Sequence, residues 1–271
     1  MSTQSAYTGW DVRRAGPEGA GHRLLMLPGG MCTTEFYADV MAEPALAEAG
    51  FGMVAVTLPG FGGTPPPRDV TMENYAGMMA EFAADEGCDV LVGHSLGANV
   101  AIEMVAAGVF SGPVVLLSPT FSRGDESRFL GVMDRVGRVP GVGSLAWAVM
   151  MKALPGVMRK ELPPARAEVL AADMGRNDPR ICRRIVRGYY AYLDRHGSLV
   201  DRLCRSGASA WVVRGDRDEV GLTEEEREGL RACPRVTMVE VPDAGHAALV
   251  EQPARIAEVI VEAAGAGTGR R

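Results

Sequence analysis

One pentapeptide, Gly93-His94-Ser95-Leu96-Gly97, constrains this chain more than any other segment because of what lies on either side of it. The apolar run Val90-Leu91-Val92 precedes it, and a helix-forming stretch begins at Ala98. A serine between two glycines at a strand-to-helix turn has the pattern of a nucleophile elbow, in which the small flanking residues let the backbone turn sharply. The pattern predicts that the Ser95 hydroxyl stands above a strand end, where the following helix N-terminus favours negative charge.

A serine hydroxyl needs a base, usually a histidine that is oriented by a carboxylate. The chain has four histidines. His22 lies in a polar turn and His196 in a charged helical stretch, so we interpret both as structural residues. His94 is locked within the elbow itself. His246 follows a strand-like run and comes directly after a glycine, and we therefore expect it to be the general base.

The carboxylate that orients His246 should also follow a strand. The strand-like run 210–214 ends at a glycine, and two candidates, Asp216 and Asp218, come after it. We choose Asp218 because the chain has room to turn toward the elbow three residues past that glycine. Asp216 is the alternative, although its position suits capping of the turn. The resulting order of serine, aspartate and histidine differs from the orders in chymotrypsin and subtilisin.

The negatively charged oxygen of a tetrahedral intermediate needs two hydrogen-bond donors, which backbone N–H groups usually supply. We expect one donor to be Leu96, directly after the nucleophile. The other should come from the loop Pro28-Gly29-Gly30-Met31, where two adjacent glycines let an amide point into the site. Gly30 is the first choice there and Met31 the second, and a plain tight turn is the alternative interpretation.

These motifs together resemble the α/β-hydrolase superfamily over nearly the whole chain. Besides the elbow, Leu58-Pro59-Gly60-Phe61-Gly62-Gly63-Thr64 is similar to the loop after the second central strand of that family. Gly245-His246, followed by Glu251-Gln252-Pro253, is similar to its histidine loop. One departure is Pro28-Gly29, where many members have His-Gly. The resemblance implies an α/β fold with a mostly parallel central sheet flanked by helices, and a helical cap inserted after the sixth strand.

Alternation of strand-like and helical segments also favours a parallel sheet that is covered on both faces. The alternation stops after the run 114–117, and residues 121–207 read as helices alone. We therefore expect a core of residues 1–120 and 208–271 with a cap, or lid, of residues 121–207. Helical periodicity is visible over 36–49, 72–85 and 253–264, and the tail 265–271 is expected to be disordered.

The cap segment is rich in large apolar side chains, most of which we expect to pack within the cap. Some should face the pocket above Ser95, where unbranched methionines adapt to varied shapes. We expect Trp147, Met151 and Ser118 to contact the substrate. The composition of the cap predicts a small hydrophobic acyl compound as the partner of this chain.

Composition excludes several other classes of protein. A net charge of −6 and an isoelectric point near 5.4 argue against nucleic-acid binding, and no apolar run is long enough to span a membrane, so we expect neither partner. The first ten residues lack the basic and apolar segments of a secretion signal. The five cysteines are scattered, without a metal-ligand spacing, which predicts reduced thiols and a cytoplasmic location. They are Cys32, Cys88, Cys182, Cys204 and Cys233.

The leading hypothesis is a serine hydrolase that acts on an ester, thioester or lactone and needs no metal or cofactor. Hydrolysis of a carbon–carbon bond, or acyl transfer to an alcohol, could use the same three residues. A third hypothesis is a hydrolase fold that serves only to bind a ligand, since fold alone does not prove function.

Overall fold

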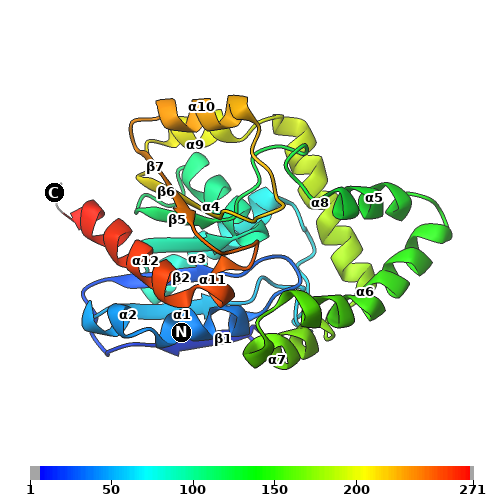
Figure 1. Ribbon diagram of the computed structural model, residues 1–271, viewed down its shortest axis with the longest axis horizontal. Coiled ribbons are helices and arrows are strands. Elements are labelled where there is room, and N and C mark those ends of the chain that lie inside the picture. Colours follow the sequence, from blue (N-terminus) through cyan, green and yellow to red (C-terminus); the bar gives the residue numbers. More distant parts are fainter. Residues whose placement is uncertain (1–6, 269–271) are drawn as a thin grey trace.

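The computed structural model describes residues 7–268, which form a seven-stranded sheet with helices on both faces (Figure 1). The strand order is β1-β3-β2-β4-β5-β6-β7. Strand β1 runs antiparallel to β3, and all other neighbours are parallel, which confirms the predicted sheet. The strands are β1 (Val12–Ala15), β2 (Arg23–Leu27), β3 (Gly52–Val56), β4 (Val90–His94), β5 (Val114–Leu117), β6 (Ala210–Gly215) and β7 (Val236–Val241).

The central strands are apolar because helices cover both of their faces. Every residue of β3, β4, β5 and β6 is buried. In β2, Leu25 and Leu27 join the apolar cluster under α3 and α4, whereas Leu24 and Met26 join the cluster under α1 and α12. This alternation follows from the two-residue period of a strand.

Helices of the core connect these strands. The segment expected as one helix over 36–49 is divided, because Pro44 begins a new helix there. The last helix continues to Thr268, so the expectation of a disordered tail from 265 is wrong up to that residue, and 269–271 lie outside the described residues. The core helices are η2 (Thr34–Tyr37), α1 (Ala38–Ala42), α2 (Pro44–Glu48), α3 (Met72–Glu86), α4 (Leu96–Ala106), α10 (Glu224–Ala232), α11 (Ala248–Glu251) and α12 (Pro253–Thr268).

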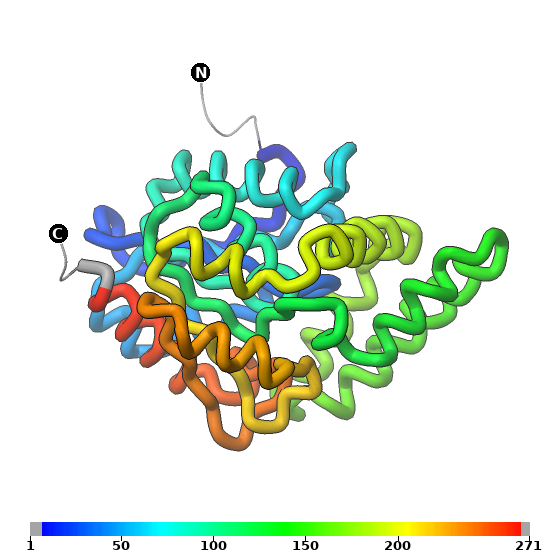
Figure 2. Tube along the Cα trace, turned by 90° about the horizontal axis from the view of Figure 1, so that it is seen from above, coloured from blue at the N-terminus to red at the C-terminus, as the bar shows by residue number. Residues whose placement is uncertain are grey.

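A helical segment separates β5 from β6, as expected, but it follows the fifth described strand and not the sixth. The reason is that only one antiparallel strand, β1, precedes β2 in the described residues. The helices are α5 (Arg128–Gly137), α6 (Val142–Glu161), α7 (Pro164–Met174), α8 (Pro179–His196) and α9 (Val200–Ser206). Helix α9 packs on α4 and α10 of the core, so we use the term cap for α5 to α8. Figures 1 and 2 show α5 and α6 extending away from the core.

Two cysteines are joined in a disulfide. Cys204 on α9 and Cys233 at the end of α10 have Cα atoms 5.7 Å apart, because these two helices pack together. The prediction of five reduced thiols is therefore wrong for this pair, whereas Cys32, Cys88 and Cys182 are free. Within residues 7–268, no helix has the length and apolar character needed to cross a membrane.

Candidate active site

Ser95 occupies a sharp turn between β4 and α4. Its φ of 50° and ψ of −120° are unusual for a residue with a side chain. The turn requires glycine on both sides: a Cβ on Gly93 would lie 2.5 Å from the carbonyl oxygen of Gly97, and a Cβ on Gly97 would lie 2.2 Å from that of Leu27. The close approach of strand and helix therefore determines the residues that flank Ser95.

The structure brings Ser95, His246 and Asp218 together from three separate loops. The Nε2 atom of His246 lies 3.1 Å from the Oγ atom of Ser95, and its Nδ1 atom lies 3.0 Å from Oδ1 of Asp218. A carboxylate only accepts hydrogen bonds, so Nδ1 carries the proton and Nε2 is free to accept from the serine. Ionised Asp218 thus holds His246 in the tautomer that can act as a base.

The side chain of Asp218 is fully buried. Burial alone raises the pKa of this carboxyl, but the hydrogen bond and charge of His246, the Ser118 hydroxyl and the Val220 N–H outweigh it, so the pKa lies below its usual value. The Val220 N–H donates to Oδ1 of Asp218 at 3.0 Å. Asp218 is therefore kept ionised beside the imidazole.

Asp216 has a different environment. Its Oδ1 atom accepts the backbone N–H of Ala244 at 3.2 Å, and its side chain lies next to that of Arg217. It therefore fastens the loop that leads to His246, whereas the imidazole itself pairs with Asp218, in keeping with a turn-capping role for Asp216.

A second histidine, His94, contacts the backbone of His246. His94 is 3% exposed, and its Nε2 donates to the backbone carbonyl of His246 at 2.9 Å. Burial, followed by the nearby charge of His246, lowers the pKa of His94 to about 3, so this ring stays neutral. The Ser118 hydroxyl donates to the same carbonyl at 3.3 Å. Ser118 was expected to contact substrate, but the structure buries it, 1% exposed, on the side of the base.

The two segments that we expect to supply the hydrogen-bond donors for the oxyanion lie next to each other. Leu96 is the first residue of α4, so the helix leaves its N–H without an internal partner. A Cβ on Gly29 would come within 3.2 Å of the Cβ of Ser95, and one on Gly30 would lie 3.5 Å from the Leu96 side chain. Met31 has a φ of 66°, in the left-handed region. The loop of residues 29–31 thus passes directly beside the elbow.

Residues 24–259 match the model of the alpha/beta hydrolase family. The chain belongs to this family. A curated relative, the highly reducing polyketide synthase virA of Hypocrea virens, is 28% identical over 144 residues, which are 49% of this chain and 6% of that protein. The chain therefore spans only a small part of the length of that relative.

Solved structures of the same fold include two hydrolases. A thermophilic esterase from Thermogutta terrifontis has a TM-score of 0.71 and 23% identity, covering 93% of this chain and 92% of its own. An enol-lactonase from Burkholderia xenovorans has a TM-score of 0.72 and 18% identity, covering 95% and 97%. At these identities the likeness establishes the fold.

In this alpha/beta hydrolase, the two cap residues expected to contact substrate lie in the cap interior. Trp147 is 1% exposed, and its indole N–H donates to the carbonyl of Met133 at 3.1 Å. Met151 is also buried. The indole is satisfied within the cap, so its surroundings are α5, α6 and α8 and not an open pocket.

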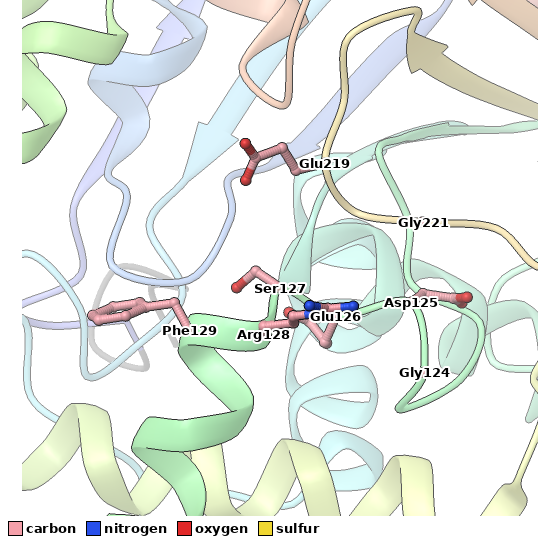
Figure 3. A pocket seen from close by; sticks show the side chains of 8 residues that line it. All are labelled: Gly124, Asp125, Glu126, Ser127, Arg128, Phe129, Glu219 and Gly221. Atoms are coloured by element: carbon pink, nitrogen blue, oxygen red, sulfur yellow. The ribbon is translucent and has the colours of Figure 1, made fainter.

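A cavity of about 380 Å³ lies at the seam between cap and core (Figure 3). On the cap side it is lined by residues 124–129, which include Ser127 and Phe129 at the start of α5. On the core side Glu219, which directly follows Asp218, turns its carboxylate toward the space. The seam is closed by the N–H of Gly221, which donates to the carbonyl of Asp125 at 2.7 Å. The loop that carries Asp218 is thus fastened to the entrance of the cap.

Proposed function

We propose that this alpha/beta hydrolase is a serine hydrolase that cleaves an ester, thioester or lactone of a small to medium hydrophobic acid through an acyl-enzyme on Ser95. The observation that carries the proposal is the hydrogen-bonded series from Ser95 through His246 to Asp218, with the serine at a strained turn. These are the parts that acyl transfer requires: a nucleophile, a base and a carboxylate that orients the base.

In the first half of the reaction, Oγ of Ser95 attacks the carbonyl carbon while its proton passes to Nε2 of His246. The carbonyl π electrons move to the oxygen, which accepts hydrogen bonds from the N–H of Leu96 and from that of Gly30 or Met31. Collapse of this intermediate breaks the bond to the leaving oxygen or sulfur. The leaving group takes the proton from His246, and the acyl group remains on Ser95.

Water then repeats the sequence in the second half. His246 accepts a proton from water, the hydroxide oxygen bonds to the acyl carbon, and Ser95 leaves with the proton returned by His246. Ionised Asp218 stabilises the imidazolium in both halves. His94 stays neutral, because its pKa is lowered to about 3, so no second positive charge opposes protonation of His246.

Two further points support the choice of bond and substrate. The esterase from Thermogutta terrifontis and the enol-lactonase from Burkholderia xenovorans share this fold, which favours ester or lactone cleavage. Next to Gly30, the side chains of Leu96 and Phe61 are apolar, which favours a hydrophobic acyl group. For a cytoplasmic location, the argument from reduced cysteines no longer applies, because Cys204 and Cys233 form a disulfide.

The experiment is a panel of p-nitrophenyl esters, thioesters and lactones of graded acyl length, with a fluorophosphonate titration of Ser95. We expect one mole of label per mole of protein and kcat/KM that rises with each methylene, by up to about 0.8 kcal/mol of transition-state binding, until the pocket is full. Ser95→Ala is the control that should take no label. A folded wild-type protein that takes no label and turns over none of the panel would overturn the proposal.

A further inference from the structure

Asn177, in the turn between α7 and α8, connects the cap to two loops of the core. Its Nδ2 atom donates to the carbonyl of Met31 at 2.8 Å and to that of Met174 at 2.8 Å. Its Oδ1 atom accepts the N–H of Gly62 at 3.0 Å. The side chain is 6% exposed, so the donors and the acceptor of this amide are used inside the protein.

Met31, which accepts one of these hydrogen bonds, has an uncommon backbone conformation. Its φ of 66° is uncommon for a residue with a Cβ, and strain of this kind persists only where the surroundings hold it in place. The hydrogen bond from Asn177 fixes the carbonyl of Met31, and hence the peptide plane that follows it. Gly30, the first-choice oxyanion donor, directly precedes this strained residue.

A second contact joins the same parts of the molecule. The hydroxyl of Thr33 donates to the carboxylate of Asp173, the residue before Met174 in α7. A Cβ on Gly62 would lie 2.5 Å from Cγ2 of Thr33, so the two core loops also pack directly on each other. The end of α7 therefore holds both loops through buried and half-buried hydrogen bonds.

We propose that Asn177 is a positioning residue for the oxyanion hole: from the cap, it holds Met31 in its left-handed conformation and so aims the N–H groups of Gly30 and Met31. This inference rests on the proposed serine hydrolase function and deepens it. The hole is then completed by the cap, and the core alone does not contain all of the parts that shape it.

The test uses Asn177→Asp in the full chain. The carboxylate can still accept from Gly62, but it has no N–H for Met31 and repels that carbonyl. We expect kcat on a p-nitrophenyl ester to fall about 10- to 100-fold, while KM stays within about threefold, because the hole acts on the transition state. The matched control is Asn74→Asp on α3, whose amide donates to the carbonyl of Asp69 and should leave kcat unchanged.

Thr33→Val is a second variant of nearly equal shape, in case Asn177→Asp does not fold, and kcat should fall by a smaller factor. Rates are divided by the number of serines that a fluorophosphonate labels at completion, so a partly unfolded sample does not imitate the effect. Folded variants with wild-type kcat per labelled serine would overturn the inference, as would losses confined to KM. Failure of the proposed function is distinct, because the wild-type protein itself would then be inactive.

A different observation concerns the far side of the cap. Nine large apolar side chains are exposed in the described residues, and seven of them lie on α5, α6 and the turn between them, which we call the outer hairpin. These seven are Phe129, Val132, Val139, Val142, Leu145, Val149 and Val157. On α6, Trp147, Met150 and Met151 are buried while Leu145 and Val149 face solvent. A helix that is apolar on both sides is expected to have a second partner.

The charges of the outer hairpin are mostly positive at its surface. Residues 128–161 hold six Arg and Lys side chains, all exposed, and two acids. Asp134 is 1% exposed and pairs with Arg123 and Arg138, whereas Glu161, the last residue of α6, is exposed. The six cations are Arg128, Arg135, Arg138, Lys152, Arg159 and Lys160. The surface therefore presents apolar groups together with an excess of positive charge.

We infer that the outer hairpin docks on an anionic lipid surface. Exposed apolar groups on a helix flanked by cations are the pattern of a helix that lies in a membrane interface. A second copy of the chain docked hairpin to hairpin would bring the cations together. The sequence expectation of no membrane partner considered only a spanning helix, which this docking does not need.

The test is flotation of the whole protein with phosphatidylcholine vesicles, with or without one quarter phosphatidylglycerol. We expect binding to the anionic vesicles only, weakened by salt, and reduced about tenfold by Leu145→Ser and about fivefold by Lys152→Gln. Val109→Ser on the core and Arg255→Gln on α12 are matched controls that should bind as the wild type does. Equal binding to neutral vesicles, no binding, or a dimer in solution that Leu145→Ser dissolves would each overturn the inference.

Discussion

The two halves of the cap differ in how they meet the rest of the molecule. The inner half, α7 and α8, is held to the core by polar contacts at several points. In the outer hairpin, apart from the ion pair of Asp134 with Arg123, the described side-chain ion pairs and hydrogen bonds are formed with other parts of the cap. The inner contacts are Arg166 with Glu35 and Asp39, Arg184 with the carbonyl of Pro67, Arg195 with Glu73, and Asn177 with Met31 and Gly62. Those of the outer hairpin include Arg138 with Asp134 and Ser144 with Arg183.

Charge explains part of this difference. Residues 121–207 contain 16 Arg and Lys against 9 Asp and Glu, whereas the rest of the chain contains 12 against 25. Cations that face the acidic core find partners there, and those on the outer hairpin remain exposed. One basic segment thus serves two purposes: the inner half shapes the active site, and the outer half presents a surface.

The largest expected effect on activity comes from Ser95 in the core. The effects expected for the two halves of the cap are compared with it. Ser95→Ala should lower kcat by about 10⁴-fold or more, because it removes the atom that forms the acyl-enzyme. The measurement is p-nitrophenyl ester turnover, with the melting temperature as the control for folding. Wild-type turnover in a folded variant would assign the nucleophile elsewhere.

Asp218→Asn should come next, with a loss of about 10³- to 10⁴-fold in kcat, because an amide no longer favours the right tautomer of His246. The matched variant Asp216→Asn changes a residue that only caps the turn at Ala244, and it should lose less than about tenfold. Steady-state kinetics of both variants compare the two carboxylates. The reverse ranking would transfer the orienting role to Asp216.

The seam between the cap and the loop of Asp218 should respond to pH. Asp125 is 3% exposed, and burial, followed by a hydrogen bond with Glu226, raises its pKa to about 7. At pH values between the ordinary pKa of 3.8 and the raised pKa of about 7, Asp125 is protonated in the folded protein and ionised in the unfolded chain. The free energy of unfolding that this group contributes therefore falls as the pH rises through that range.

Asp125→Asn removes that titration. Relative to wild type, the variant should gain about 1 to 3 kcal/mol of unfolding free energy between pH 5 and pH 7.5, since one pKa unit corresponds to about 1.4 kcal/mol. Urea denaturation at the two pH values measures the difference. Asp201→Asn, an exposed acid on α9, should show no such gain, and parallel pH profiles for Asp125→Asn and wild type would contradict the interpretation.

The smallest effect compares one arginine from each half of the cap. Arg166→Met should cost about 1 to 2 kcal/mol, because Arg166 pairs with Glu35 and Asp39 at a site that is 22% exposed. Arg135→Met, on the exposed side of α5, should change stability by less than about 0.5 kcal/mol. Urea denaturation tests the pair. Equal losses would show that the two halves are held alike.

Sequence reasoning found the features that short motifs encode. The elbow around Ser95 requires glycines that are visible in the sequence, and the ends of β6 and β7 could be located from apolar runs followed by glycine. Because the carboxyl ends of parallel strands meet at one edge of a sheet, such local signals suffice to predict that Ser95, Asp218 and His246 come together.

Contacts between segments that are distant in sequence could not be predicted. No motif marks Asn177. Its hydrogen bonds depend on where α7 ends relative to Met31. The position of Ser118 after a strand does not reveal that its hydroxyl contacts the loop of His246, and its contact with substrate stays a prediction. The pairing of Cys204 with Cys233 depends on the packing of α9 against α10, which cysteine spacing does not encode.

That disulfide has a mechanical consequence for the active site. It closes a ring of chain, 29 residues in sequence separation, which contains β6 and the loop of Asp218. Closing a ring of this size restricts the unfolded chain by roughly 3 to 4 kcal/mol in the entropy model. A protease that cuts the exposed part of the ring would leave both fragments covalently joined, so the strand that carries the acid could remain seated in the sheet. The disulfide thus restrains the segment of Asp218 although Cys204 precedes β6 and Asp218 follows it.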